Sequence, residues 1–406
     1  MSVGLDYPKK LEIISGIRLS AGSAQIYRKK RNDIALIEIS ADSVTSAAFT
    51  KNHFCAAPVQ ISKNNIKKSK PRYCLINSGN ANAGTGQSGI NNSKTTCKAL
   101  AKITNCDETS VLPFSTGVIG EDLPVKKINK TLPDLVRNLS DDCWLEVAKS
   151  IMTTDTIPKA VSRQIKVLDS TISITGIAKG SGMIKPDMAT MLSFIATDAN
   201  ITKVCLDKIK DNALKKSFNR ITVDGDTSTN DSFLLIATCK AKNPEINEQN
   251  SKEFEILENE IIKVCCELAQ AIIRDGEGAT KFIRIQIFDG QDSSECLSVA
   301  YKVAESLLVK TAFTASDPNW GRILAAIGNS KIKNLDISKV NIYIGDVCIV
   351  ENGERSKMYT EESGKKVMDQ DEITLKISLK RGSCNEEIWT TDLSYEYIKI
   401  NAEYRS

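Results

Sequence analysis

The sequence predicts a mixed α/β protein. Six runs rich in β-branched residues, several with the alternation of a half-buried strand, are expected to form strands: residues 34–39, 73–77, 232–240, 282–288, 340–344 and 373–379. Residues 254–273 instead carry apolar side chains at helical spacing and predict a long amphipathic helix. Because these strands and helices alternate without the regular rhythm of a doubly wound sheet, we expect mixed sheets.

The remaining elements are predicted from shorter signals. Residues 163–177 alternate like a hairpin, with Asp169 and Ser170 as the expected turn. Asp317 and Pro318 suit the start of a helix, as cap and first-turn residue. Residues 242–251 are polar and predict a surface loop or linker. Further helices are expected at 93–103, 125–139, 206–217 and 296–308.

Composition bounds the class of protein. A chain of 406 residues can bury a large core in two or three lobes. Its net charge of +4 is small, and basic and acidic residues are interleaved, which argues against a nucleic-acid partner. The N-terminus lacks the pattern of a signal or transit peptide, and no apolar run approaches the roughly 18 residues of a membrane span. We therefore expect a cytoplasmic protein that does not bind membranes.

Cysteine and histidine usage constrains the chemistry. The twelve cysteines are scattered, with no CxxC pair, which favours reduced thiols over disulfides or a zinc site. His53 is the one histidine of the chain, and its surroundings favour a structural role. Any acyl-transfer chemistry is therefore expected to use a base other than histidine.

Four segments combine glycine with hydroxyl and amide side chains: 77–86, 115–120, 178–192 and 224–231. Each segment alone is better explained by turns and helix caps, because glycine allows positive φ and Ser, Thr, Asn and Asp cap or turn. None contains the GxxxxGK[ST] pattern of a phosphate-binding loop.

Together these segments resemble the glutamate N-acetyltransferase / ornithine acetyltransferase family over nearly the whole chain. Gly84 departs from the family, which usually has cysteine there, but the change is small and leaves the resemblance intact. The matching motifs, in order, are NSGNANAGTG (77–86), STGVIG (115–120), MTTDT (152–156), AKGSGMIKPDMATML (178–192), DGDTSTND (224–231), DGEGATK (275–281), KTAFTASDPNWGRILAAIG (310–328) and NAEYRS (401–406).

The resemblance implies a layered, N-terminal-nucleophile-like fold of the ornithine acetyltransferase type, without cofactor or metal. It implies that the Ala189–Thr190 bond is cut, giving an α chain (1–189) and a β chain (190–406), two of each per assembly. Thr190 is then the nucleophile, and Thr116 and Gly117 form the oxyanion hole. The positions that match the family's substrate contacts are Thr153, Lys179, Thr190, Glu277, Asn401 and Ser406.

This chemistry suits the residues. A threonine hydroxyl needs a base to activate it, and an N-terminal threonine carries an amine with a pKa of about 7.7–8.0 on its own α-carbon. The same hydroxyl could first attack the Ala189 carbonyl and so cut the chain. The expected reaction is ping-pong: Thr190 takes acetyl from N-acetylornithine and passes it to glutamate. Lys179 would pair with an α-carboxylate and Glu277 with the ornithine ammonium.

Other interpretations stay open at this point. A self-processed amidase or aminopeptidase would pass the acyl group to water, and only the substrate-contact positions argue against it. A non-catalytic scaffold would leave the chain uncut. Without the resemblance, Lys179 and Glu277 could equally be surface ions. Some members of the family also accept acetyl-CoA as acetyl donor, and the sequence does not distinguish them.

Overall fold

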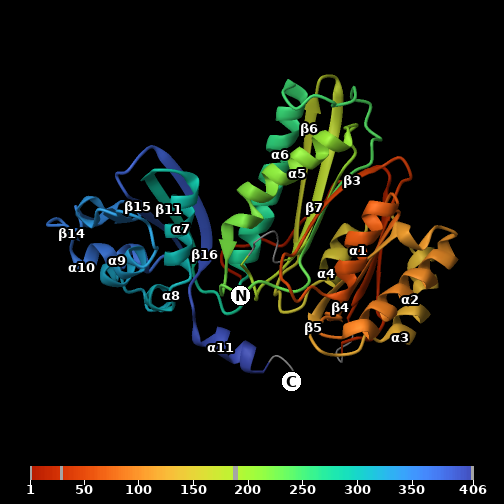
Figure 1. Cartoon of the computed structure of the whole chain (residues 1–406), viewed down its shortest axis with the longest axis horizontal. Coiled ribbons are helices and arrows are strands. Elements are labelled where there is room, and N and C mark those ends of the chain that lie inside the picture. Colours follow the sequence, from red (N-terminus) through yellow and green to blue (C-terminus); the bar gives the residue numbers. More distant parts are fainter. Residues whose placement is uncertain (1, 28–30, 186–190, 404–406) are drawn as a thin grey trace.

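The computed structural model describes residues 2–27, 31–185 and 191–403, and these form three β-sheets covered by helices (Figure 1). The predicted mixed α/β class is confirmed, since each sheet combines parallel and antiparallel pairs. No helix among the described residues is long and apolar enough to cross a bilayer. All twelve cysteines are free thiols, five of them buried.

The first sheet has the order β1-β2-β4-β5 and is formed by Ile17–Gly22, Ile34–Ile39, Tyr73–Asn80 and Val111–Val118. Helices α2 (Gly86–Thr104) and α3 (Val125–Arg137) pack on one face, where their leucines meet apolar side chains of β2 and β4. Helices α1 (Ala57–Lys68) and α4 (Trp144–Ser150) flank this sheet. Its other face is buried against the second sheet.

The second sheet has the order β3-β10-β8-β7-β6, formed by Val44–Phe49, Ser232–Ala237, Leu192–Thr197, Ser170–Lys179 and Lys159–Val167. Phe114 of β5 and Phe194 of β8 meet edge to face between the two sheets, with ring centroids 5.0 Å apart. Helices α5 (Lys203–Lys216) and α6 (Lys252–Arg274) cover the outer face. The two sheets therefore lie between two helical layers, which gives the N-terminal part a four-layer architecture.

The third sheet belongs to a C-terminal lobe with its own core (Figure 1). Its order is β14-β13-β12-β15-β11-β16-β9, from Glu354–Arg355, Val347–Glu351, Asn341–Ile344, Glu372–Ser378, Phe282–Gly290, Cys384–Thr391 and Ile221–Thr222. The helices of this lobe are α7 (Ser293–Ala304), α8 (Leu307–Thr314), α9 (Trp320–Gly328) and α10 (Glu361–Met368). A last helix, α11 (Tyr395–Ala402), extends from the lobe toward the N-terminal layers.

Three local predictions are corrected. The hairpin turn lies at Leu168 and Asp169, one residue early, because Leu168 takes the positive φ that a two-residue loop needs while Ile172 stays buried. The predicted helix 296–308 is two helices, broken where the Ser306 side chain caps α8. The cap of α9 is Asn319, which accepts from the Arg322 N–H, so that helix begins after Pro318.

The predicted linker at 242–251 is irregular, as expected, but it is anchored. Asn243 and Ile246 are buried, and Ile246 forms an isolated bridge with Ile201. The segment is therefore a packed loop of the second sheet rather than a free connection between lobes.

Candidate active site

A cavity of about 270 Å³ lies where the ends of strands from the first and second sheets approach α11. Strand β5 contributes its end, and β7 contributes its end and the residues that follow. The start of β8, the loop before β10, the loop after α6 and α11 add further residues, and the segments that follow β4 and α4 complete the wall. The lining residues are Ala81, Thr116, Gly117, Val118, Ile119, Thr153, Thr154, Lys179, Gly180, Gly182, Met183, Ile184, Met191, Leu192, Ser228, Thr229, Asn230, Asp231, Glu277 and Asn401.

Six of the predicted site residues line this cavity: Thr116, Gly117, Thr153, Lys179, Glu277 and Asn401. They come from segments separated by as much as 285 positions, from Thr116 to Asn401. The other predicted positions, Ala189, Thr190 and Ser406, lie outside the described residues. Ile184 and Met191, which flank the predicted cleavage position in the chain, both line the cavity.

Gly117 occupies a position that no other residue fits. Its φ is +131°, and a Cβ added there would lie 2.3 Å from the carbonyl carbon of Gly79. This close approach comes from the irregular register between β4 and β5, where the pairing shifts at Asn80. The tight packing fixes the backbone at the rim of the cavity, as an oxyanion hole requires.

Lys179, the last residue of β7, joins this rim to the ion pairs behind it. Its Nζ donates to the Thr116 hydroxyl over 3.2 Å, which leaves the Thr116 proton available to another acceptor. Burial lowers the pKa of Lys179, while the charges of Asp155, Asp231 and Glu277 oppose that shift. The cavity therefore places the Lys179 amine next to the group expected to stabilise negative charge.

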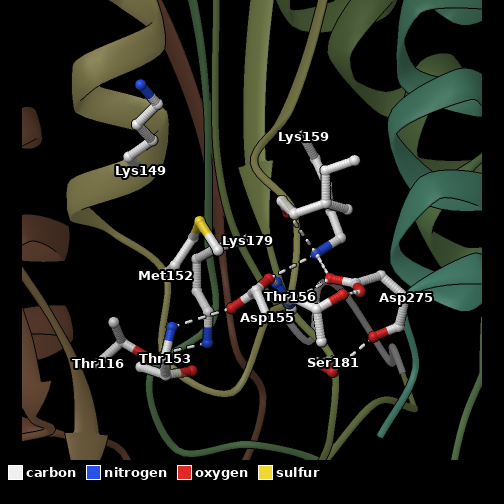
Figure 2. Close-up of polar contacts among 12 residues, drawn as sticks. Thr116, Lys149, Met152, Thr153, Asp155, Thr156, Lys159, Lys179, Ser181 and Asp275 are labelled. Atoms are coloured by element: carbon white, nitrogen blue, oxygen red, sulfur yellow. Dashed lines mark hydrogen bonds and ion pairs between the residues drawn. The ribbon is translucent and has the colours of Figure 1, made fainter. Parts of the chain in front are cut away.

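A buried ion network lies behind Lys179 (Figure 2). The Lys159 ammonium lies 2.6 Å from an oxygen of Asp155 and 2.6 Å from an oxygen of Asp275, and all three side chains are at most 1% exposed. Burial alone would raise the pKa of Asp155, but the charges of Lys159 and Lys179 hold it well below its usual value. Burial would lower the pKa of Lys159, but the two aspartates raise it.

This network fixes the segments that carry the lining residues. Asp155 accepts from the Thr153 N–H at 3.0 Å and from the Gly180 N–H at 2.8 Å. The Asp275 carbonyl accepts from the Ser181 hydroxyl at 2.6 Å. Thr153, Lys179 and Glu277 each lie within two positions of a residue that is hydrogen-bonded to Asp155 or Asp275 or is one of them. The network therefore holds the backbone beside all three.

Helix α11 brings the C-terminal region onto the cavity. Asn401 Nδ2 donates to Glu277 Oε2 at 2.8 Å, and the Glu277 N–H donates to the Ser181 carbonyl at 2.9 Å. Gly278 has a φ of +66°, and a Cβ there would lie 2.4 Å from the Tyr397 nitrogen, so only glycine lets α11 pack this closely. The fold-back that a role for Ser406 requires is therefore in place up to Asn401.

The chain is held on both sides of the predicted cleavage position. Upstream, the Asp224 carboxylate accepts from the N–H groups of Met183 and Ile184, at 2.6 and 2.9 Å. Downstream, the Ser232 N–H donates to the Met191 carbonyl at 2.9 Å. These contacts fix the described chain at Ile184 and at Met191.

Several groups lie away from the cavity. His53 is exposed and does not line it. Arg322 donates to the Leu308 carbonyl at 2.9 Å, which is the structural role expected of its motif. Within the described ranges, no group of His, Cys, Asp or Glu is placed to hold a metal ion.

Neither the buried network nor the state of Asp231 can be recognised from the sequence motifs. Asp155, Asp231 and Asp275 stand in the quoted motifs, so their positions were visible there, but nothing in the sequence pairs them with Lys159. Asp231 is 2% exposed, lines the cavity, and has an oxygen with no hydrogen-bond partner among the described residues.

Residues 18–406 match the family model described as the ArgJ family. The chain belongs to the ArgJ family. It is 52% identical over the full length of both chains to the "Arginine biosynthesis bifunctional protein ArgJ" of Pseudomonas syringae pv. tomato. It is 50% identical, again over both full lengths, to the protein of the same name from Pseudomonas fluorescens. A solved structure with the same protein name, from Bacillus halodurans, is 34% identical to this chain. The match covers 50% of this chain and 95% of the solved one, with a TM-score of 0.48.

Proposed function

We propose that this ArgJ-family chain is an enzyme of arginine biosynthesis that transfers acetyl from N-acetylornithine to glutamate through an acetyl-Thr190 ester. This reaction is supported by sequence identities of 52% and 50%, over the full length, to two curated bifunctional ArgJ proteins. The observation that carries the site is that six predicted residues from distant segments line one cavity, together with Ile184 and Met191, which flank the predicted cleavage position in the chain.

Self-cleavage precedes catalysis. The Thr190 hydroxyl attacks the Ala189 carbonyl, the peptide bond becomes an ester, and water hydrolyses it to release residues 1–189 and 190–406. The new Thr190 amine then serves as the base for its own hydroxyl. The anchored flanks, at Asp224 upstream and Ser232 downstream, support this step, because they restrict the segment on either side of the bond.

Transfer follows in two half-reactions. The Thr190 oxygen attacks the acetyl carbonyl of N-acetylornithine, its proton passes through the amine to the departing ornithine nitrogen, and an acetyl ester remains. The glutamate amine then attacks the ester, loses a proton to the Thr190 amine, and restores the hydroxyl. Thr116 and the Gly117 N–H stabilise the oxyanion in both, and one such donor typically contributes about 3–4 kcal/mol.

The charged residues bind the two ends of the substrate. Lys179 pairs with the α-carboxylate and Glu277 with the side-chain ammonium of ornithine, and each is a charge-assisted contact. Thr153, Asn401 and Ser406 complete the substrate contacts. Support comes from the position of Lys179 and Glu277 on one cavity wall, each tied to the same buried network.

Three finer proposals accompany this reaction. The enzyme also acetylates glutamate with acetyl-CoA, which the word bifunctional in the names of its relatives supports. The cut chains assemble as two α and two β chains. The enzyme acts in the cytoplasm, where its twelve free cysteines stay reduced.

The reaction is tested by incubating the purified protein with N-acetylornithine, with and without glutamate. The proposal predicts rapid formation of N-acetylglutamate and a single turnover of ornithine release when glutamate is absent. Steady release of acetate at a rate that glutamate does not change would instead show a hydrolase. Replacing N-acetylornithine by acetyl-CoA in the same assay tests the second activity.

A further inference from the structure

Asp231 differs from every other charged residue at the cavity. It directly precedes β10, whose first residue pairs with Leu192 of β8, so it lies beside the start of β8. Its side chain is 2% exposed, and Oδ2 has no hydrogen-bond partner among the described residues. Buried polar atoms are nearly always paired, so an unpaired carboxyl oxygen at a cavity wall indicates a group that awaits a ligand.

The protonation state of Asp231 follows from its surroundings. Burial raises its pKa well above the ordinary value, and hydrogen bonding from Ser228 and the charge of Lys179 offset this only in part. Asp155 shows the contrast, since it is equally buried but paired with Lys159 and therefore ionised. A buried carboxyl with an unpaired oxygen favours its neutral form, and in that form Asp231 can donate a hydrogen bond.

Among the described residues, no other ionisable side chain that lines the cavity is hydrogen-bonded to the Asp231 carboxyl. Lys179 of β7 and Glu277 after α6 are the other ionisable side chains that line the cavity in the described part of the chain. Glu277 already accepts from Asn401, and Asp155 is held by Lys159. On the β3 side, the Thr50 N–H bonds the Asp231 backbone carbonyl, not its side chain.

The two substrates of the proposed reaction make different demands on these charges. N-acetylornithine carries one carboxylate and one ammonium, which Lys179 and Glu277 match. Glutamate carries two carboxylates, and Lys179 can neutralise only one of them. A second carboxylate is accepted if a neutral acid donates to it and rejected if that acid is ionised.

We propose that Asp231 is a specificity-determining residue for glutamate, which in its protonated form donates a hydrogen bond to the second carboxylate of that substrate. When Asp231 loses its proton, the cavity gains a negative charge. Glutamate is then repelled, while N-acetylornithine, with its ammonium, is tolerated. The inference rests on the proposed acetyl transfer. It assigns the different pH dependence of glutamate binding and N-acetylornithine binding to the proton on Asp231.

Two inhibitors of equal chain length, compared in the wild-type enzyme and in the Asp231→Asn variant, isolate this effect. Glutarate has a carboxylate at both ends, whereas 5-aminopentanoate has an ammonium at one end. Loss of the charge on Lys179 or on the Thr190 amine also weakens glutarate more than 5-aminopentanoate, so the contribution of Asp231 is the part of the pH dependence that the Asp231→Asn variant abolishes. The ratio of their inhibition constants, glutarate over 5-aminopentanoate, should therefore rise with pH, by up to about tenfold per unit above the Asp231 pKa, as a single linked proton requires.

The Asp231→Asn variant keeps a neutral donor of almost the same shape. It should still use glutamate, and its inhibitor ratio should rise with pH less steeply than the wild-type ratio. Asp198→Asn is the matched control, because Asp198 also has a pKa raised by burial but follows the far end of β8 and does not line the cavity. That variant should retain the wild-type pH dependence.

A wild-type inhibitor ratio that is constant between pH 6 and 9 would overturn the inference, as would an Asp231→Asn enzyme with the wild-type pH dependence. Either outcome leaves acetyl transfer intact. Failure of the proposed function appears separately, as the absence of N-acetylglutamate at every pH.

Discussion

Replacing Lys159 by methionine removes the cation that pairs with two buried aspartates, Asp155 and Asp275. Methionine preserves most of the side-chain volume, so the change isolates the charge. Lys159 Nζ lies 2.6 Å from Asp155 and 2.6 Å from Asp275, and none of the three side chains is more than 1% exposed. Removing one partner of a buried ion pair costs about 3–5 kcal/mol, because the remaining charge stays unpaired.

The loss should depend on pH in a defined direction. In the wild type, the lowered pKa of Asp155 gives stability that is present above the unfolded pKa of about 3.9 and lost as pH falls through the folded value. The raised pKa of Lys159 gives stability that is present below about 10.4 and lost as pH rises through the folded value. Without Lys159, Asp155 favours its protonated form, so the deficit of the variant should shrink toward pH 4.

The assay is denaturant unfolding of both proteins at pH 4.5, 7 and 9, followed by tryptophan fluorescence. Trp144 is buried between the first two sheets and reports on their separation. Lys203→Met is the matched control, since Lys203 also pairs with an aspartate four positions away, Asp207, but both side chains are about half exposed. An exposed pair of this kind contributes about 0–1 kcal/mol. A Lys159→Met loss no larger than the control, or one that grows toward acid pH, would refute the reasoning.

Three further predictions concern the cavity. Gly117→Ala places a Cβ 2.3 Å from the Gly79 carbonyl carbon, so kcat should fall about 100-fold or more, as it does when an oxyanion donor is lost. The control Gly328→Ala has open space around it and should leave kcat unchanged, and equal rates in the two variants would contradict the assignment. Glu277→Gln should raise KM for N-acetylornithine about 10- to 100-fold through the loss of a charged contact, and an unchanged KM would remove Glu277 from the substrate site. Asp224→Asn retains only one of the two carboxylate oxygens that accept from the Met183 and Ile184 N–H groups. The two cleavage fragments should therefore appear about tenfold more slowly on a time-course gel, and a wild-type half-time of cleavage would show that this anchor is not needed.

The sequence predicts the class of elements well where the pattern is long. Residues 34–39 form β2 and 254–273 form the centre of α6, because alternation and helical periodicity report directly on which side chains are buried. Boundaries fail where a single cap decides. Ser306 divides α7 from α8 by capping, and that local hydrogen bond leaves no trace in the apolar pattern.

The site shows the same division. The motifs identify residues such as Lys179 and Glu277, but the contacts that fix them require the fold. Lys159 and Asp275 are 116 positions apart and meet only because β6 packs against the C-terminal end of α6. The unpaired state of Asp231 is likewise a property of its surroundings, not of its place in the sequence.

The central claim is that Thr190 carries the acetyl group on a chain that begins at that residue. The most direct test is intact-mass and peptide mass spectrometry of the protein after exposure to N-acetylornithine without glutamate. We expect two fragments, 1–189 and 190–406, with one added acetyl group on the hydroxyl of Thr190 that disappears when glutamate is supplied. The Thr190→Ala protein should remain a single chain without acetyl. An uncut wild-type chain that still transfers acetyl, or an acetyl group located on another residue, would contradict the account.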